Sequence, residues 1–75
     1  MSDAVREALL ATMRRWQSEG AHWTSDLAHG ARVTTAQARR ALASLARDGL
    51  VKKVVEGNPT SWELAVEQAA KEPRA

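Results

Sequence analysis

The sequence predicts a small α+β fold in which three helices are followed by a β-hairpin. Two observations carry this prediction. Segments 5–16 and 34–48 place apolar residues at the spacing of amphipathic helices. Segments 50–55 and 61–66 have the composition of strands and flank the turn signal Asn58-Pro59. The chain has 75 residues, which allows one domain with a small core.

The first helix is expected over 5–16, where apolar residues recur every three or four positions. Ser2 or Asp3 can cap its start, and Gly20 can end it. Trp16 extends the apolar stripe, so we expect its ring in the core. The stripe consists of Val5, Ala8, Leu9, Thr12, Met13 and Trp16.

A short second helix is expected from about Ser25 to Gly30, with Thr24 as its N-cap. The preceding Ala21-His22-Trp23 is typical of a short extended piece, which can pair with the later hairpin. We expect Trp23 to be a core residue rather than a surface on which a ligand stacks.

The third helix has the strongest local signals. Residues 34–37, Thr-Thr-Ala-Gln, match the capping box, in which two side chains satisfy backbone N–H groups at the helix start. The helix is expected from about Thr35 to Asp48, with Gly49 just beyond its end and Leu50 packing back onto it. Its inward stripe is Ala38, Ala41, Leu42 and Leu45.

The hairpin is expected from the valines that begin it and from an alternating second strand. The pair Lys52-Lys53 interrupts the first alternation, so a β-bulge is one alternative there. In the second strand, Trp62, Leu64 and Val66 share one face. We expect the domain to span 1–66 and residues 67–75 to form a flexible tail, with a frayed helix that helps dimerisation as the alternative.

The positive charge of the chain is concentrated in its middle. The net charge is +2, but residues 32–56 hold six basic and two acidic side chains, a net +4. The segments on either side are each slightly acidic. Such a distribution is typical of a surface that binds a polyanion, and a solvated helix face is the alternative interpretation.

Segment 24–51, "TSDLAHGARVTTAQARRALASLARDGLV", resembles the core of bacterial winged helix-turn-helix regulators, including the DNA-binding domains of the GntR and MarR families. The resemblance covers roughly residues 5 to 66 and rests mostly on core and cap positions. It implies that the helix at 34–48 is the recognition helix and that the hairpin at 51–66 is the wing. It also implies a small bacterial or phage transcriptional regulator that binds double-stranded DNA.

In this fold the recognition helix enters the major groove, and the wing lies on the DNA backbone. Arg39 is the first choice for contacting base edges and Arg40 the second, because arginine pairs well with guanine. Arg40 can alternatively contact a phosphate, and the wing is expected to add phosphate affinity. The expected DNA-binding residues are Arg32, Thr34, Thr35, Ala36, Arg39, Arg40, Arg47, Lys52, Lys53, Asn58, Pro59 and Thr60.

Two other functions stay open at this point. The hairpin end is similar to that of Zα domains, which bind left-handed nucleic acid, because Pro59 and Trp62 match a proline at the tip and a following tryptophan. At the recognition-helix positions where that family has lysine, asparagine and tyrosine, this chain has Thr35, Arg39 and Ala43. The second alternative is a winged helix that binds only proteins.

Other chemistry has little support in the sequence. There are no cysteines, and His22 and His29 are the only histidines, without partners at metal-ligand spacing. Nucleophile motifs and phosphate-binding glycine loops are absent. We therefore expect no enzyme activity, metal or cofactor. We also expect a cytoplasmic protein without membrane segments, with double-stranded DNA and a second copy of itself, in a homodimer, as partners.

Overall fold

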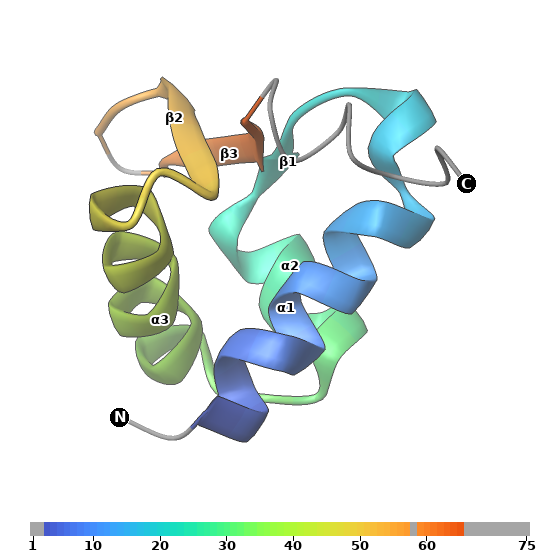
Figure 1. Ribbon diagram of the computed structural model, residues 1–75, viewed down its shortest axis with the longest axis vertical. Coiled ribbons are helices and arrows are strands. Elements are labelled where there is room, and N and C mark those ends of the chain that lie inside the picture. The colour runs from blue at the N-terminus through green and yellow to red at the C-terminus, as the bar shows by residue number, and fades with distance from the viewer. Residues whose placement is uncertain (1–2, 58, 66–75) are drawn as a thin grey trace.

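The computed structural model describes residues 3–57 and 59–65 (Figure 1). Its helices are α1 (Asp3–Arg15), the 3₁₀ helix η1 (Gln17–Glu19), α2 (Thr24–Ala31) and α3 (Thr35–Arg47). Its strands are β1 (His22–Trp23), β2 (Val51–Val55) and β3 (Ser61–Leu64), which lie together at one end of the helices. The predicted α+β class and element order are confirmed. Ser2, Val66 and the tail at 67–75 lie outside the described residues, so the calls on them, including the domain boundary, stay predictions.

The strands form one antiparallel sheet in the order β1-β3-β2, so the last strand lies in the middle. The expected pairing of residues 21–23 with the hairpin is confirmed, because His22 pairs with Trp62 and Trp23 with Ser61. The bulge is also confirmed. The register between β2 and β3 shifts between Lys53 and Val55, which leaves one extra residue in β2.

Both ends of α3 form as their local sequence predicts. Thr34 Oγ1 accepts a hydrogen bond from Gln37 N at 3.0 Å, and Thr34 N donates to Gln37 Oε1 at 2.9 Å. At the other end, Gly49 has a left-handed φ of 81°. Leu50 N then donates to Leu45 O at 2.9 Å, which closes the helix end in a Schellman motif. Helix α3 is thus closed at both ends by residues within or next to it.

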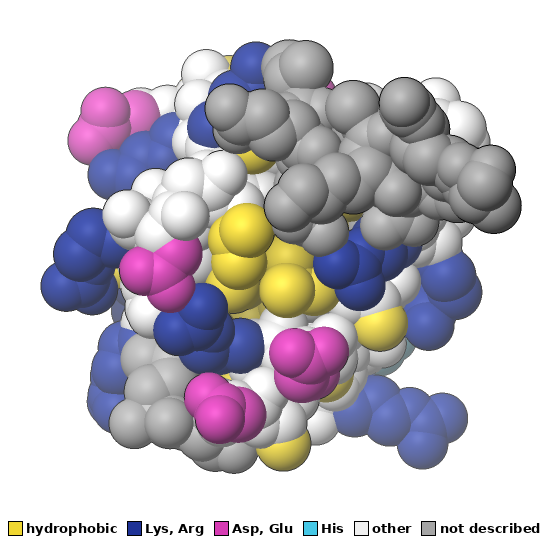
Figure 2. Space-filling model, viewed as in Figure 1, with side chains coloured by type: hydrophobic (Ala, Val, Ile, Leu, Met, Phe, Trp, Pro, Cys, Tyr) yellow, Lys and Arg dark blue, Asp and Glu magenta, His cyan; other side chains and the backbone are white. Residues whose placement is uncertain are grey.

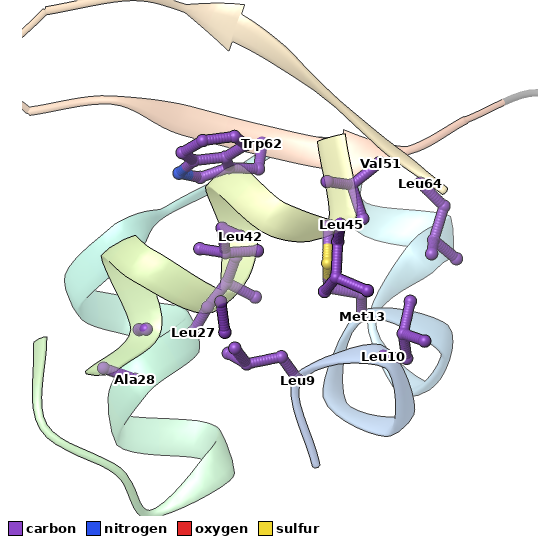
Figure 3. Close-up of a cluster of buried hydrophobic side chains, with 12 residues drawn as sticks. Leu9, Leu10, Met13, Leu27, Ala28, Leu42, Leu45, Val51, Trp62 and Leu64 are labelled. Carbon is purple, nitrogen blue, oxygen red and sulfur yellow. The ribbon is translucent and has the colours of Figure 1, made fainter. Parts of the chain in front are cut away.

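The core lies between the three helices and the inner face of the sheet (Figure 3). Trp62 and Leu64 reach it from β3 and are 2% and 8% exposed. Trp16 packs against the core while remaining partly exposed, which confirms its expected place only in part. The fully buried large side chains are those of Leu9, Leu27, Leu42, Leu45 and Thr12.

Helix α1 ends at Arg15, one residue before the end expected at 16, but Gly20 ends the 3₁₀ helix η1 rather than α1. Two other expectations about the first half of the chain were wrong. Thr24 does not cap α2, whose N-cap is Trp23 without a side-chain bond. The Thr24 hydroxyl is instead occupied by partners from the hairpin. Trp23 is not a core residue, since its side chain lies on an edge strand and is 42% exposed.

Candidate nucleic-acid interface

The outward face of α3 is set by the four side chains that it buries, Ala38, Ala41, Leu42 and Leu45. At 3.6 residues per turn, successive side chains are rotated by about 100° around the helix. Ala36, Arg40, Ala43 and Arg47 therefore lie opposite the core, and all four are exposed. Arg39 and Thr35 lie on the flank of this face and are also exposed.

The arginines of α3 and of the turn before it are all exposed. Within the described residues, no ion pair includes Arg32, Arg39, Arg40 or Arg47. No acidic residue occurs within α3. Asp48 follows the helix, and its carboxylate lies 2.7 Å from the Arg6 guanidinium of α1. The positive charge of α3 is thus uncompensated at the surface, and Figure 2 shows Lys and Arg side chains projecting from the edge along which α3 runs.

The two lysines of the wing differ from these arginines. Lys52 Nζ lies 3.3 Å from Glu63 across the hairpin, and Lys53 Nζ lies 3.3 Å from Glu56. Lys53 Nζ is also 5.9 Å from the centre of the Trp62 ring. Because all of these charged side chains are substantially exposed, the pairs are weak and open to competition. They still leave the wing with less free positive charge than the sequence suggested.

A groove with a volume of about 310 Å³ lies where α2, α3 and the wing tip meet. Arg39 lines it together with Gly57 and Pro59. The other lining residues all carry hydroxyl groups: Thr24, Ser25, Thr35 and Thr60. The structure therefore brings together four residues predicted for DNA binding, and adds two at the start of α2 that the sequence analysis did not select.

Thr24 joins the start of α2 to the wing. Its hydroxyl donates to the Thr60 carbonyl at 2.9 Å and accepts from Trp62 Nε1 at 2.7 Å. Its backbone N–H donates to the same Thr60 carbonyl at 3.0 Å. At the wing tip, Thr60 Oγ1 donates to the Gly57 carbonyl at 2.6 Å. These bonds hold the start of α2 against the wing, and the two parts form adjacent walls of the groove.

Two other predicted residues, Arg32 and Thr34, do not line the groove. Arg32 occupies the α2–α3 turn with a left-handed φ of 61°, which is uncommon for a residue other than glycine. Thr34 is exposed, and its side chain is used in the capping box. Asn58 lies outside the described residues.

A second hollow, of about 260 Å³, is lined by Trp16, Glu19, His22, Asp26 and His29. The Trp16 and His22 rings are 5.1 Å apart, and His22 Nε2 lies 3.2 Å from the Trp16 carbonyl oxygen. Within residues 3–57 and 59–65, no His, Asp or Glu side chains form a group that could hold a metal ion. In the same part of the chain, no helix has the length and hydrophobicity of a membrane span.

Comparison with solved structures gives close matches of the whole arrangement. A suspected DNA-binding protein from Ralstonia eutropha JMP134 is 27% identical with a TM-score of 0.74, over 93% of this chain and 90% of that chain. Escherichia coli MarR, in complex with operator DNA, is 18% identical with a TM-score of 0.67, over 93% of this chain and 49% of that chain. The chain folds as a winged helix-turn-helix domain. No protein-family model matches its sequence, and no curated protein does either.

The chain is also similar in structure to a Zα domain, the family that the hairpin sequence resembles. The Zα domain of Carassius auratus PKZ, in complex with Z-DNA, is 18% identical with a TM-score of 0.66, over 81% of this chain and 97% of that chain. In the present chain, the α2–α3 pair is the helix-turn-helix, and β2 and β3 form the wing. At these identities the two complexes establish the shared fold.

Proposed function

We propose that this winged-helix domain binds double-stranded DNA sequence-specifically, with α3 in the major groove and the wing on the backbone. The observation that carries the proposal is the outward face of α3. This face and its flank present three exposed arginines that form no ion pair with any described residue, and α3, which is closed at both ends, contains no carboxylate. A protein-binding face would more often be apolar or acidic, so this face favours a polyanion as the partner.

The fold supplies the docking geometry. Helix-turn-helix domains place the N-terminal part of the recognition helix against base edges. Ala36 and Arg40 lie in that part of α3, facing away from the core. Arginine recognises guanine through two parallel hydrogen bonds, and an alanine methyl can contact thymine. The winged-helix neighbours that were solved with operator DNA and with Z-DNA support a nucleic-acid partner.

Right-handed duplex DNA is favoured over the Z-form. Trp62, which carries the Zα resemblance together with Pro59, is 2% exposed, and its indole N–H is bonded to Thr24. The α3 position that holds a tyrosine in Zα domains is Ala43 here. The tyrosine contact expected of a Z-form binder is thus replaced by a methyl group, and Trp62 is a core residue.

The charge count sets the expected salt dependence. Each neutralised phosphate contributes about −0.9 to the slope of log K against log salt concentration. With Arg40 at a base edge, Arg32, Arg39 and Arg47 together give a slope of roughly −2.7. One such module buries about 600–1,000 Å² of protein surface, which usually gives modest specificity. We therefore also propose that two copies bind a palindromic site as a homodimer, as bacterial or phage regulators of transcription do.

Selection of bound duplexes from a random library tests the proposal. Enrichment of one sequence would support sequence-specific binding, and a palindrome would support the dimer. Arg40→Ala should weaken binding to the selected duplex, while Arg15→Ala, an exposed arginine at the far end of α1, should change it little. Failure to retain any duplex at low salt would refute DNA binding and favour the protein adaptor.

A further inference from the structure

The two adjacent arginines of α3 lie in different surroundings. Arg39 lines the groove between α2, α3 and the wing tip, whereas Arg40 is not among the groove's lining residues. They are separated by about 100° around the helix axis. Arg40 lies closer to the centre of the outward face, beside Ala36 and Ala43. A straight approach of α3 into a major groove would thus bring Arg40 to the bases and leave Arg39 at the rim.

The groove has the chemistry of a phosphate site. Among its described lining residues, Arg39 is the one charged side chain, and none is a carboxylate. The hydroxyls of Thr24 and Thr60 already donate to backbone carbonyls. Those of Ser25 and Thr35 make no hydrogen bond within the described part of the chain, so their O–H groups are free to donate. Arginine and hydroxyl donors are common partners of phosphate oxygens.

We propose that this groove holds one backbone phosphate of the bound duplex, with Arg39 as its clamp and Ser25 and Thr35 as additional donors. This inference rests on the proposed function and reverses the order predicted from sequence, in which Arg39 was the first base-reading residue. Arg40 takes that role instead. The groove also lies between the helix-turn-helix and the wing, so a phosphate held there by α2 and α3 would lie beside the wing tip.

The first test compares Arg39→Ala with Arg40→Ala by fluorescence anisotropy on the selected duplex and its single-base variants. Arg39→Ala should weaken binding to every duplex by a similar factor and reduce the salt slope by about 0.9. Arg40→Ala should instead lower the preference at one base pair, by about 5- to 150-fold. Both side chains are exposed, and circular dichroism should show that both variants remain folded.

The second test neutralises single phosphates of the duplex with methylphosphonate linkages. Wild-type binding should fall at several linkages, and Arg39→Ala should be insensitive to one of them while remaining sensitive to the others. Ser25→Ala should show a smaller loss at the same linkage. If Arg39→Ala changes base preference, or is coupled to no single linkage, the inference is overturned while DNA binding stands. If wild-type protein binds no duplex, the proposed function fails first and the inference fails with it.

Discussion

Replacing Trp62 by alanine should strongly lower the free energy of unfolding of the domain. The Trp62 side chain leaves the central strand β3, enters the core and is 2% exposed. It is the most buried of the three tryptophans in a chain that has no Phe or Tyr. No other side chain of comparable size can therefore fill the space between the sheet and α3.

The cost of this substitution has two parts. Truncating a buried large aromatic to alanine costs about 3–5 kcal/mol. Losing the Trp62 Nε1 bond to the Thr24 hydroxyl adds about 1 kcal/mol, and that hydroxyl keeps its bond to the Thr60 carbonyl. A domain of this size has a total stability on the order of 4–11 kcal/mol. The substitution thus removes a third or more of the free energy of unfolding.

Urea denaturation followed by far-ultraviolet circular dichroism measures this loss. Trp62→Phe retains most of the ring and should cost about 1–2 kcal/mol, mainly through the lost hydrogen bond. Trp23→Ala is a matched control, because the 42% exposed Trp23 should be far less costly to truncate. An unchanged urea midpoint for Trp62→Ala would refute the reasoning. A folded Trp62→Ala that no longer binds DNA would make Trp62 a contact residue and restore the Zα interpretation.

Three further substitutions test the scaffold and the wing. Gly30→Ala should cost about 1–3 kcal/mol in urea denaturation, because the new Cβ would lie 2.6 Å from Trp16 Cη2; an unchanged midpoint would mean that the ring moves aside freely. Thr34→Ala should cost about 1 kcal/mol in a thermal melt, and Thr34→Ser should restore most of it; equal melts would deny the capping box. Two free cations would contribute roughly 1.8 to the salt slope of DNA binding. Lys52→Ala with Lys53→Ala should lower that slope by less, because both lysines are paired with carboxylates. The full decrease would show that these carboxylates release the lysines on binding.

The features that the sequence predicted well depend on residues close together in the chain. The capping box joins Thr34 to Gln37, three positions apart, and the Schellman motif joins Leu45 to Leu50. The periodic stripe that α3 buries is likewise a property of one helix. Patterns of this kind are visible before any tertiary contact is known, because the partners of each bond are fixed by local spacing.

The features that were missed depend on partners far apart. Threonine is a common N-cap residue, but the hydroxyl of Thr24 is bonded to Trp62 and to the carbonyl of Thr60 in the hairpin instead of to the backbone of α2. Trp23 has the size of a core residue, but its strand lies at a sheet edge where its outer face remains open. Which partner wins in each case is decided by the packing of the wing onto α2, which no local window of sequence contains.

The candidate site shows the same division. Composition and periodicity placed the exposed arginines on α3, but could not show that Lys52 and Lys53 meet carboxylates on the wing. They also could not show that the neighbouring Arg39 and Arg40 lie in different surroundings. That separation appears only when the wing tip and the start of α2 form the groove beside one of them.

The buried face and the outward face of α3 have no residue in common. Its stability comes from the capped ends and from Ala38, Ala41, Leu42 and Leu45, whereas the side chains proposed to meet DNA contribute nothing to the core. A change of target sequence therefore needs no compensating change in the interior. Substitutions at positions 36, 40 and 43 by residues with good helix propensity should therefore leave the fold intact, so this helix is a suitable starting point for directed evolution toward other operators.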